Sequence, residues 1–204
     1  MAFLFESQYF PPQCFYACLL RKPIFIESNE HYQKRSLRNK CIIQNANGLQ
    51  VLTIPLLRGK HQQMNICRVE ISYGTRWQVR HLQAIRSAYG SAPYFDHYYG
   101  LLETEMLHRS QYLIEFNTRL TKFIASLLGI PWQVSFTEKY ERKPNNLIDH
   151  RQYFTPRNFS KVSSYLSYPQ VFSEKHPFTP NLSILDILFC QGPEAITKLR
   201  KMNV

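Results

Sequence analysis

Apolar and polar positions change their spacing along the chain, and these changes predict its first elements. Residues 3–10 ("FLFESQYF") are mostly apolar and stop at Pro11, which predicts a strand. Residues 13–22 ("QCFYACLLRK") predict a short apolar helix, and residues 24–28 ("IFIES") predict a buried strand. Strand, short helix and strand together predict a βαβ opening with two parallel strands.

Three further stretches have the alternation that is typical of β-strands. In residues 40–57, two strand-like runs flank Asn47 and Gly48, and this pair predicts a tight hairpin turn with positive φ values. Residues 66–72 ("ICRVEIS") alternate apolar and polar side chains, which predicts a half-buried strand. Residues 132–140 ("WQVSFTEKY") alternate again and predict a returning strand.

The spacing becomes helical after residue 74. Residues 75–90 carry a stripe that recurs every four residues and ends at Gly90, which predicts a helix with a glycine stop. The stripe consists of Trp77, His81, Ile85 and Tyr89. Residues 94–109 and 110–129 predict two more helices, the second of them strongly amphipathic.

These patterns predict an α/β fold of mixed α+β character in one domain spanning residues 1–204. We expect a mixed sheet with a βαβ-like opening and a β-hairpin, followed by a mainly helical C-terminal half. In this scheme residues 1–74 are mostly strands, 75–130 helical, 141–180 an irregular packed segment and 181–202 short helices. At 204 residues the chain can bury a sizeable core without a metal or a disulfide.

The charge of the chain favours anionic partners. The net charge is +11 at pH 7, and the Lys and Arg residues are spread along the chain. Such a field suits nucleotides, sugar phosphates, acidic carrier proteins, nucleic acid or anionic lipid. Nucleic acid is disfavoured among these, because the cations form no stripe and no binding module is recognisable. No apolar run reaches the length of about 18 residues that a membrane span needs, so no span is expected.

The cysteines and the known motifs exclude several classes of site. Five cysteines, an odd number without a C-x-x-C pair, predict reduced thiols in a cytoplasmic protein and no metal site. Nucleotide-binding, hydrolase and zincin signatures are absent, which makes an enzyme less expected without excluding one. No cofactor is indicated.

Two stretches carry candidate chemistry. The segment "HYQKRSLRNK" (31–40) is either a solvated turn or a basic loop in which Lys34 and Arg38 hold an anion. His81 is either a general base or a core histidine bonded to a backbone group. Tyr9 and Pro11 close the first strand, at the end where parallel sheets bind ligands, although physical reasoning alone slightly favours a structural turn.

Several short motifs in a fixed order resemble the WbqC-like family of bacterial proteins. They are Tyr9-Phe10-Pro11-Pro12, "HYQKRSLRNKC", "LTIP" (52–55), Trp77 with His81, "AYGSAPYF" and the tail "NLSILDILFCQGPEA". The chain departs from the family pattern at Glu6, Ser7, Cys14, Leu37 and Lys40. The Lys…Arg-Asn core of the basic segment is retained.

The resemblance implies a transferase of surface-polysaccharide (O-antigen-type) biosynthesis, which passes a glycyl or aminoacyl group to a nucleotide-linked amino sugar. The alternative is a non-catalytic module that binds a nucleotide sugar or an acidic carrier protein. Under the first hypothesis the partner is an anionic small molecule, and the roles divide into catalysis, anchoring and pocket walls. His81 is the base, Asn39 a donor to the carbonyl, Lys34 and Arg38 the anchors, and Tyr9, Pro11, Trp77 and Tyr94 the walls.

Overall fold

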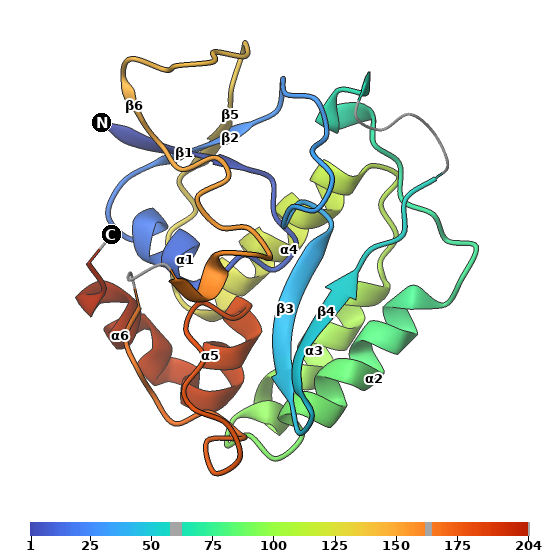
Figure 1. Cartoon of the computed structure of the whole chain (residues 1–204), viewed down its shortest axis with the longest axis vertical. Helices are drawn as coiled ribbons and strands as arrows, with labels where there is room; N and C mark the ends of the chain where they lie inside the picture. The colour runs from blue at the N-terminus through green and yellow to red at the C-terminus, as the bar shows by residue number, and fades with distance from the viewer. Residues whose placement is uncertain (58–62, 162–164, 204) are drawn as a thin grey trace.

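Four short parallel strands form the central sheet in a computed structural model that describes residues 1–57, 63–161 and 165–203 (Figure 1). They are β1 (Ala2–Glu6), β2 (Ile24–Glu27), β5 (Val134–Phe136) and β6 (Leu147–Asp149), in the order β5-β2-β1-β6. All three pairings are parallel, so the carboxyl ends of the four strands share one edge. The helix α1 (Gln13–Leu19) joins β1 to β2, which confirms the predicted βαβ opening.

The two faces of this sheet have different neighbours. Phe5 on β1 packs edge-on against Phe15 of α1 with 5.0 Å between ring centroids, so this face belongs to the helical core. Leu4 and Phe25 lie on the other face, beside the loop that joins β5 to β6. Alternation of side chains along a strand explains this division.

The predicted hairpin is confirmed and forms a two-stranded antiparallel sheet of its own. It consists of β3 (Lys40–Asn45) and β4 (Gly48–Thr53). Ala46 and Asn47 connect the strands, one position earlier than the predicted pair Asn47-Gly48. Of that pair only Gly48 has a positive φ, +110°, a value that glycine adopts without steric cost.

The three helices predicted between residues 75 and 130 are present. They are α2 (Trp77–Tyr89), α3 (Phe95–Leu107) and α4 (Leu113–Leu127). The chain then closes with α5 (Ile184–Gln191), a 3₁₀ turn at Gly192–Glu194 and α6 (Ala195–Lys201). Within the described ranges, no helix combines the length and the apolar character needed to cross a membrane.

Two segments differ from the prediction. Residues 66–72 do not form a strand: Ile66–Arg68 is a 3₁₀ turn, because the side chain of Asn65 accepts a hydrogen bond from Cys67 N. Only isolated bridges remain there, at Glu70 and Ile71. In the segment 141–180, strand β6 was not predicted, because three residues are too few to show a period.

The rest of the segment 141–180 is held down by a buried polar contact with α5. The carboxylate of Asp186 accepts hydrogen bonds from the Tyr168 hydroxyl at 2.7 Å and from Gln170 Nε2 at 2.9 Å. Burial raises the pKa of Asp186 to about 6, against the opposing effect of these donors. The segment therefore packs against the core through specific partners as well as through its aromatic rings.

Candidate functional site

The carboxyl edge of the parallel sheet is unusually polar for a buried region. Strand β1 ends at Glu6 and β2 at Glu27, and these side chains are 0% and 1% exposed. β1 lies between β2 and β6, so the carboxyl ends of three neighbouring strands meet here. Ligands of open parallel sheets bind outside the carboxyl ends of the strands.

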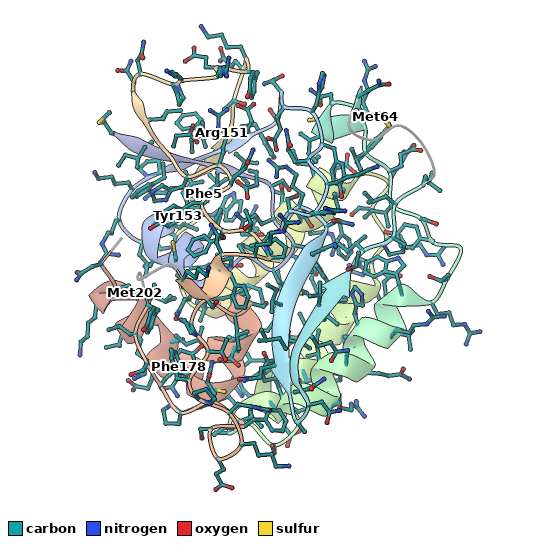
Figure 2. All side chains as sticks on the ribbon, in the orientation of Figure 1. Phe5, Met64, Arg151, Tyr153, Phe178 and Met202 are labelled. Atoms are coloured by element: carbon teal, nitrogen blue, oxygen red, sulfur yellow. The ribbon has the colours of Figure 1, made fainter. Side chains whose placement is uncertain are left out.

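Glu27 is the centre of one hydrogen-bond network at this edge. Its Oε1 accepts from Asn29 N at 2.8 Å and from the Thr137 hydroxyl at 2.7 Å. Its Oε2 pairs with Nη1 of Arg151 at 3.1 Å, and Arg151 also pairs with Asp149 at 2.7 Å. Arg151, which is labelled in Figure 2, thus links the ends of β2 and β6.

The same arginine also fixes the loop that follows β5. Nη2 of Arg151 donates to the carbonyl oxygens of Glu141 at 2.9 Å and of Arg142 at 3.3 Å. The guanidinium lies over the ring of Tyr140, 5.2 Å from its centroid. This loop is therefore held against the sheet edge by one side chain that is 8% exposed.

A second network joins Glu30 to Arg38. Nε and Nη2 of Arg38 donate to the two carboxylate oxygens of Glu30 at 2.7 and 2.6 Å, and Arg38 is fully buried. Burial raises the pKa of Glu30, and the opposing effect of Arg38 does not cancel this rise. Glu6 lies near Arg38 and accepts from Gln8 Nε2 at 3.0 Å and from Gln152 N at 2.8 Å.

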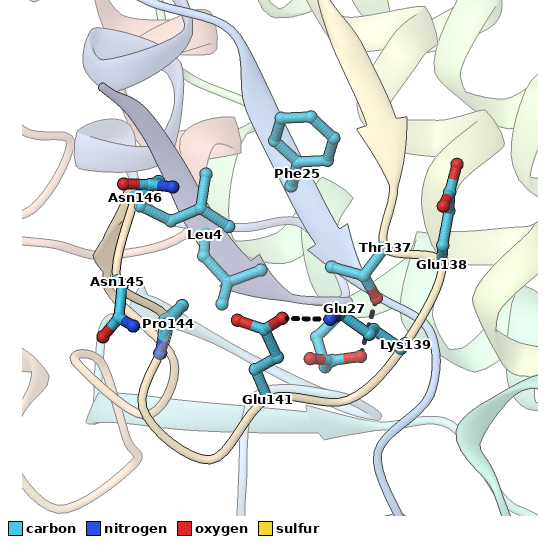
Figure 3. A pocket seen from close by; sticks show the side chains of 11 residues that line it. Leu4, Phe25, Glu27, Thr137, Glu138, Lys139, Glu141, Pro144, Asn145 and Asn146 are labelled. Carbon is cyan, nitrogen blue, oxygen red and sulfur yellow. Dashed lines mark hydrogen bonds and ion pairs between the residues drawn. The ribbon is translucent and has the colours of Figure 1, made fainter.

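A cavity of about 400 Å³ adjoins the first network, and we call it the sheet cavity (Figure 3). The strands supply Leu4, Phe25 and Glu27, and the loop 137–147 supplies the remaining walls. Two more carboxylates, of Glu138 and Glu141, are among these walls, with an ion pair of 2.9 Å between Lys139 and Glu141. An apolar floor with carboxylate and amide groups around it suits a small polar ring such as a sugar.

A second cavity of about 270 Å³, which we call the loop cavity, lies between the segment after β2 and Tyr140 of the loop after β5. It is lined by Asn29, Glu30, His31, Gln33 and Tyr140. The two cavities are neighbours, because the wall residue Asn29 donates its backbone N–H to the wall residue Glu27 at 2.8 Å.

The structure brings three of the predicted site residues together in the core. The Tyr9 hydroxyl lies 3.0 Å from Nδ1 of His81, and the ring centroids of Trp77 and His81 are 5.1 Å apart. Burial lowers the pKa of His81 to about 4, against a hydrogen bond with the backbone of Thr53. His81 is thus a neutral imidazole with two partners, the arrangement of a satisfied core histidine.

Arg38 and Asn39 are also engaged inside the protein. Asn39 Oδ1 accepts from the Tyr32 hydroxyl at 3.0 Å, and Asn39 Nδ2 donates to the carbonyl of Ile54 at 2.9 Å. Asn39 is 6% exposed and Arg38 is 0% exposed, whereas Lys34 is exposed to solvent.

The remaining predicted residues lie elsewhere. The carbonyl of Pro11 accepts from Ile184 N at 3.1 Å, and Tyr94 lies against Gly192 at the start of α3. In the described part of the chain, none of the eight predicted side chains lines the sheet cavity or the loop cavity.

The residues that do surround the cavities were not predicted as a site. Glu27 lies at the end of the predicted buried strand 24–28 and Glu30 follows it, so the rule for parallel sheets points to both. Tyr140 ends the strand predicted over residues 132–140, so the same rule points to it. Arg151 carries no such signal, since its contacts depend on strands that are distant in sequence. No group of three or more His, Cys, Asp or Glu side chains that could hold a metal occurs in residues 1–57, 63–161 and 165–203.

Comparison with known proteins gives a family and one curated relative. The sequence profile described as "WbqC-like protein family" matches residues 6–156 and 149–198. A protein of Mycobacterium tuberculosis (strain ATCC 25618 / H37Rv), described as "Uncharacterized protein Rv1507c", is 28% identical over an alignment of 228 positions. The alignment covers 96% of this chain and 95% of that protein. No solved structure matches the chain.

Proposed function

The chain belongs to the WbqC-like protein family, and on this premise we propose that it is a cytoplasmic transferase of bacterial surface-polysaccharide biosynthesis. The reaction we propose passes a glycyl or other aminoacyl group to the amine of a nucleotide-linked sugar. The observation that carries the proposal is the sheet cavity, which lies on the face of the parallel sheet that carries Leu4 and Phe25 and reaches Glu27 and Thr137 at the carboxyl ends of β2 and β5. Ligands of parallel sheets bind near the carboxyl ends of strands.

The lining of the sheet cavity fits an amino sugar. The apolar face of a sugar ring can pack on Phe25 and Leu4, which form the floor. The carboxylate of Glu27, which Arg151 and Thr137 hold in place, can accept hydrogen bonds from an amine or a hydroxyl. Binding in this orientation points the nucleotide diphosphate out of the cavity, toward Arg142 and Lys143, which are exposed on the same loop.

Transfer to an amine also requires a proton acceptor. The nitrogen attacks the carbonyl carbon of the ester or thioester donor, a C–N bond forms, and the bond from the carbonyl to the leaving oxygen or sulfur breaks. The proton that the amine loses passes through a general base to the departing alcohol or thiol. Among the described groups that line the sheet cavity, the carboxylates of Glu27, Glu138 and Glu141 can take that proton. We assign the proton to Glu141, because its side chain is 44% exposed and, among the residues that the structure describes, forms an ion pair with Lys139 alone.

The predicted residues receive revised roles in this proposal. Arg38 fixes Glu30 at the loop cavity. Asn39 and His81 stabilise the core, because the polar atoms of their side chains already have hydrogen-bond partners. Lys34 remains available as a cation that attracts an anionic ligand, because it is exposed and lies in the same loop as His31 and Gln33 of the loop cavity.

The experiment is a transfer assay on the purified chain with nucleotide-linked amino sugars and activated aminoacyl esters or thioesters, read by mass spectrometry. We expect a product heavier by one aminoacyl residue. Glu141→Gln should lose most of the rate, and Glu174→Gln, which removes the same charge from an exposed position, should not. Equal rates in the two variants would contradict the assignment of Glu141.

The second candidate function is a non-catalytic module that binds a nucleotide sugar or an acidic carrier protein. One observation favours it: the carboxylates of Glu6, Glu27 and Glu30 all accept hydrogen bonds from other groups of the chain. The ring of His81 is likewise hydrogen-bonded to Tyr9 and to the backbone of Thr53. Saturable binding of a nucleotide sugar, without product for any donor, would support this candidate over the transferase.

A further inference from the structure

The charges buried at the carboxyl edge of the sheet do not balance. Three carboxylates there are almost wholly buried, with Glu6 at 0%, Glu27 at 1% and Glu30 at 6% exposed. Arg38, whose side chain is 0% exposed, is paired with Glu30, and Arg151, whose side chain is 8% exposed, is paired with Glu27. Among the residues that the structure describes, one buried negative charge is thus in excess. A buried charge without a counter-charge is costly, so such a site favours a cation.

The excess of buried negative charge makes the ionised form of the Glu30 carboxylate less stable. Burial raises its pKa, Arg38 opposes the rise, and the nearby charges of Glu6 and Glu27 add to it. A cation beside Glu30 would stabilise the ionised carboxylate and relieve the repulsion among the three acids.

The loop cavity offers room for that cation. Glu30 forms one wall, and the two hydrogen bonds from Arg38, at 2.7 and 2.6 Å, fix its orientation. Each carboxylate oxygen has a further lone pair that can accept from a ligand. Asn29 and Gln33 add amide oxygens, and Tyr140 adds an aromatic ring whose position is set by the guanidinium of Arg151.

We propose that the loop cavity binds a small primary ammonium compound. The carboxylate of Glu30 is its counter-charge, and the ring of Tyr140 is an aromatic wall that attracts cations through its face. A metal ion fits less well, because the described part of the chain holds no group of three or more candidate ligands. The proposal goes beyond the transferase function and does not rest on it, since it concerns the other cavity.

The probe is glycinamide, compared at pH 7 with glycolamide, which has the same size and a hydroxyl in place of the ammonium. Calorimetry or ligand-observed NMR on the full chain should show saturable binding of glycinamide only. Tyr140→Ala should weaken it about two- to fivefold, the range expected from a partly exposed cation–π contact. Tyr140→Phe should bind like the wild type, and Tyr165→Ala is the matched control, with 40% exposure at Tyr165 against 52% at Tyr140.

Removal of the carboxylate gives an independent test. Glu30→Gln should abolish binding of glycinamide; if that variant does not fold because Arg38 is left unpaired, the double variant Glu30→Gln/Arg38→Met removes both charges. Equal binding of glycinamide and glycolamide would overturn the proposal, and so would wild-type affinity in both Tyr140→Ala and the Glu30 variant. No sugar nucleotide is used, so failure here is distinct from failure of the transfer assay.

Discussion

Replacement of Arg38 by alanine distinguishes a structural from a ligand-binding role for the basic segment 31–40. The guanidinium is fully buried and donates to both carboxylate oxygens of Glu30, at 2.7 and 2.6 Å. Arg38→Ala therefore leaves the Glu30 carboxylate buried without its main partner. Lys34, four residues earlier, is exposed and provides the matched control.

The expected magnitude follows from the burial of the pair. Removal of one partner from a buried ion pair costs about 3–5 kcal/mol of unfolding free energy. In a chain of 204 residues, 1 kcal/mol lowers the Tm by about 2–4 °C. We therefore expect Arg38→Ala to lower the Tm by about 6–20 °C, and Lys34→Ala to change the stability by less than about 0.5 kcal/mol.

Urea unfolding followed by circular dichroism, together with thermal melts, measures both variants. The double variant Arg38→Met/Glu30→Leu should recover most of the loss, because replacing both partners with apolar side chains removes the unpaired charge. A Tm of Arg38→Ala within about 2 °C of the wild type would refute the reasoning, as would an equal loss in Lys34→Ala.

Three further predictions concern the core. Burial raises the folded-state pKa of Asp186 from 3.8 to about 6. The unfolding free energy of the wild type should therefore fall by about 2.5 kcal/mol relative to Asp186→Asn as the pH rises from 4 to 7, measured by urea unfolding at each pH. The effect of pH through His81 runs in the opposite direction, because burial lowers the folded-state pKa of its imidazole from 6.5 to about 4. The unfolding free energy should therefore decline by about 3 kcal/mol through this residue as the pH falls from 7 to 4. NMR titration of its ring should show a neutral imidazole at pH 6, and a charged ring would contradict this. Gly192→Ala should destabilise by more than about 2 kcal/mol, because φ is +50° and a Cβ would lie 2.4 Å from the ring of Tyr94. Gly129→Ala, with a φ of +65° and no atom within 4 Å, should cost only about 1 kcal/mol in thermal melts, and equal costs would contradict the steric argument.

Elements fixed by local pattern were predictable from the sequence. The βαβ opening, the hairpin and helices α2 to α4 each depend on an apolar period or a turn residue within the element. Strand β6 depends instead on pairing with β1, where Ala2 aligns with Leu147, and three residues show no period. Residues 66–72 have the period of a strand, but the side chain of Asn65 forms a turn first.

The candidate site was predictable only in its position. The expectation that ligands bind where the first strands end points to the edge that carries Glu6 and Glu27. The basic segment signals charge, but its composition cannot show that Arg38 turns inward to meet Glu30. Arg151, which joins two strand ends to the loop after β5, comes from a segment without any period, so only the folded chain reveals its contacts.

The most direct test of the sheet cavity as a sugar site is calorimetric titration with a nucleotide-linked amino sugar. Phe25 forms the cavity floor, and loss of its ring contact with a ligand should raise the Kd about tenfold in Phe25→Ala. Phe136 on the neighbouring strand is 48% exposed and does not line the cavity, so Phe136→Ala should bind within about twofold of the wild type. Saturable binding with this difference is the result we predict. Absence of binding to the wild type, or equal affinities of the two variants, would contradict the account.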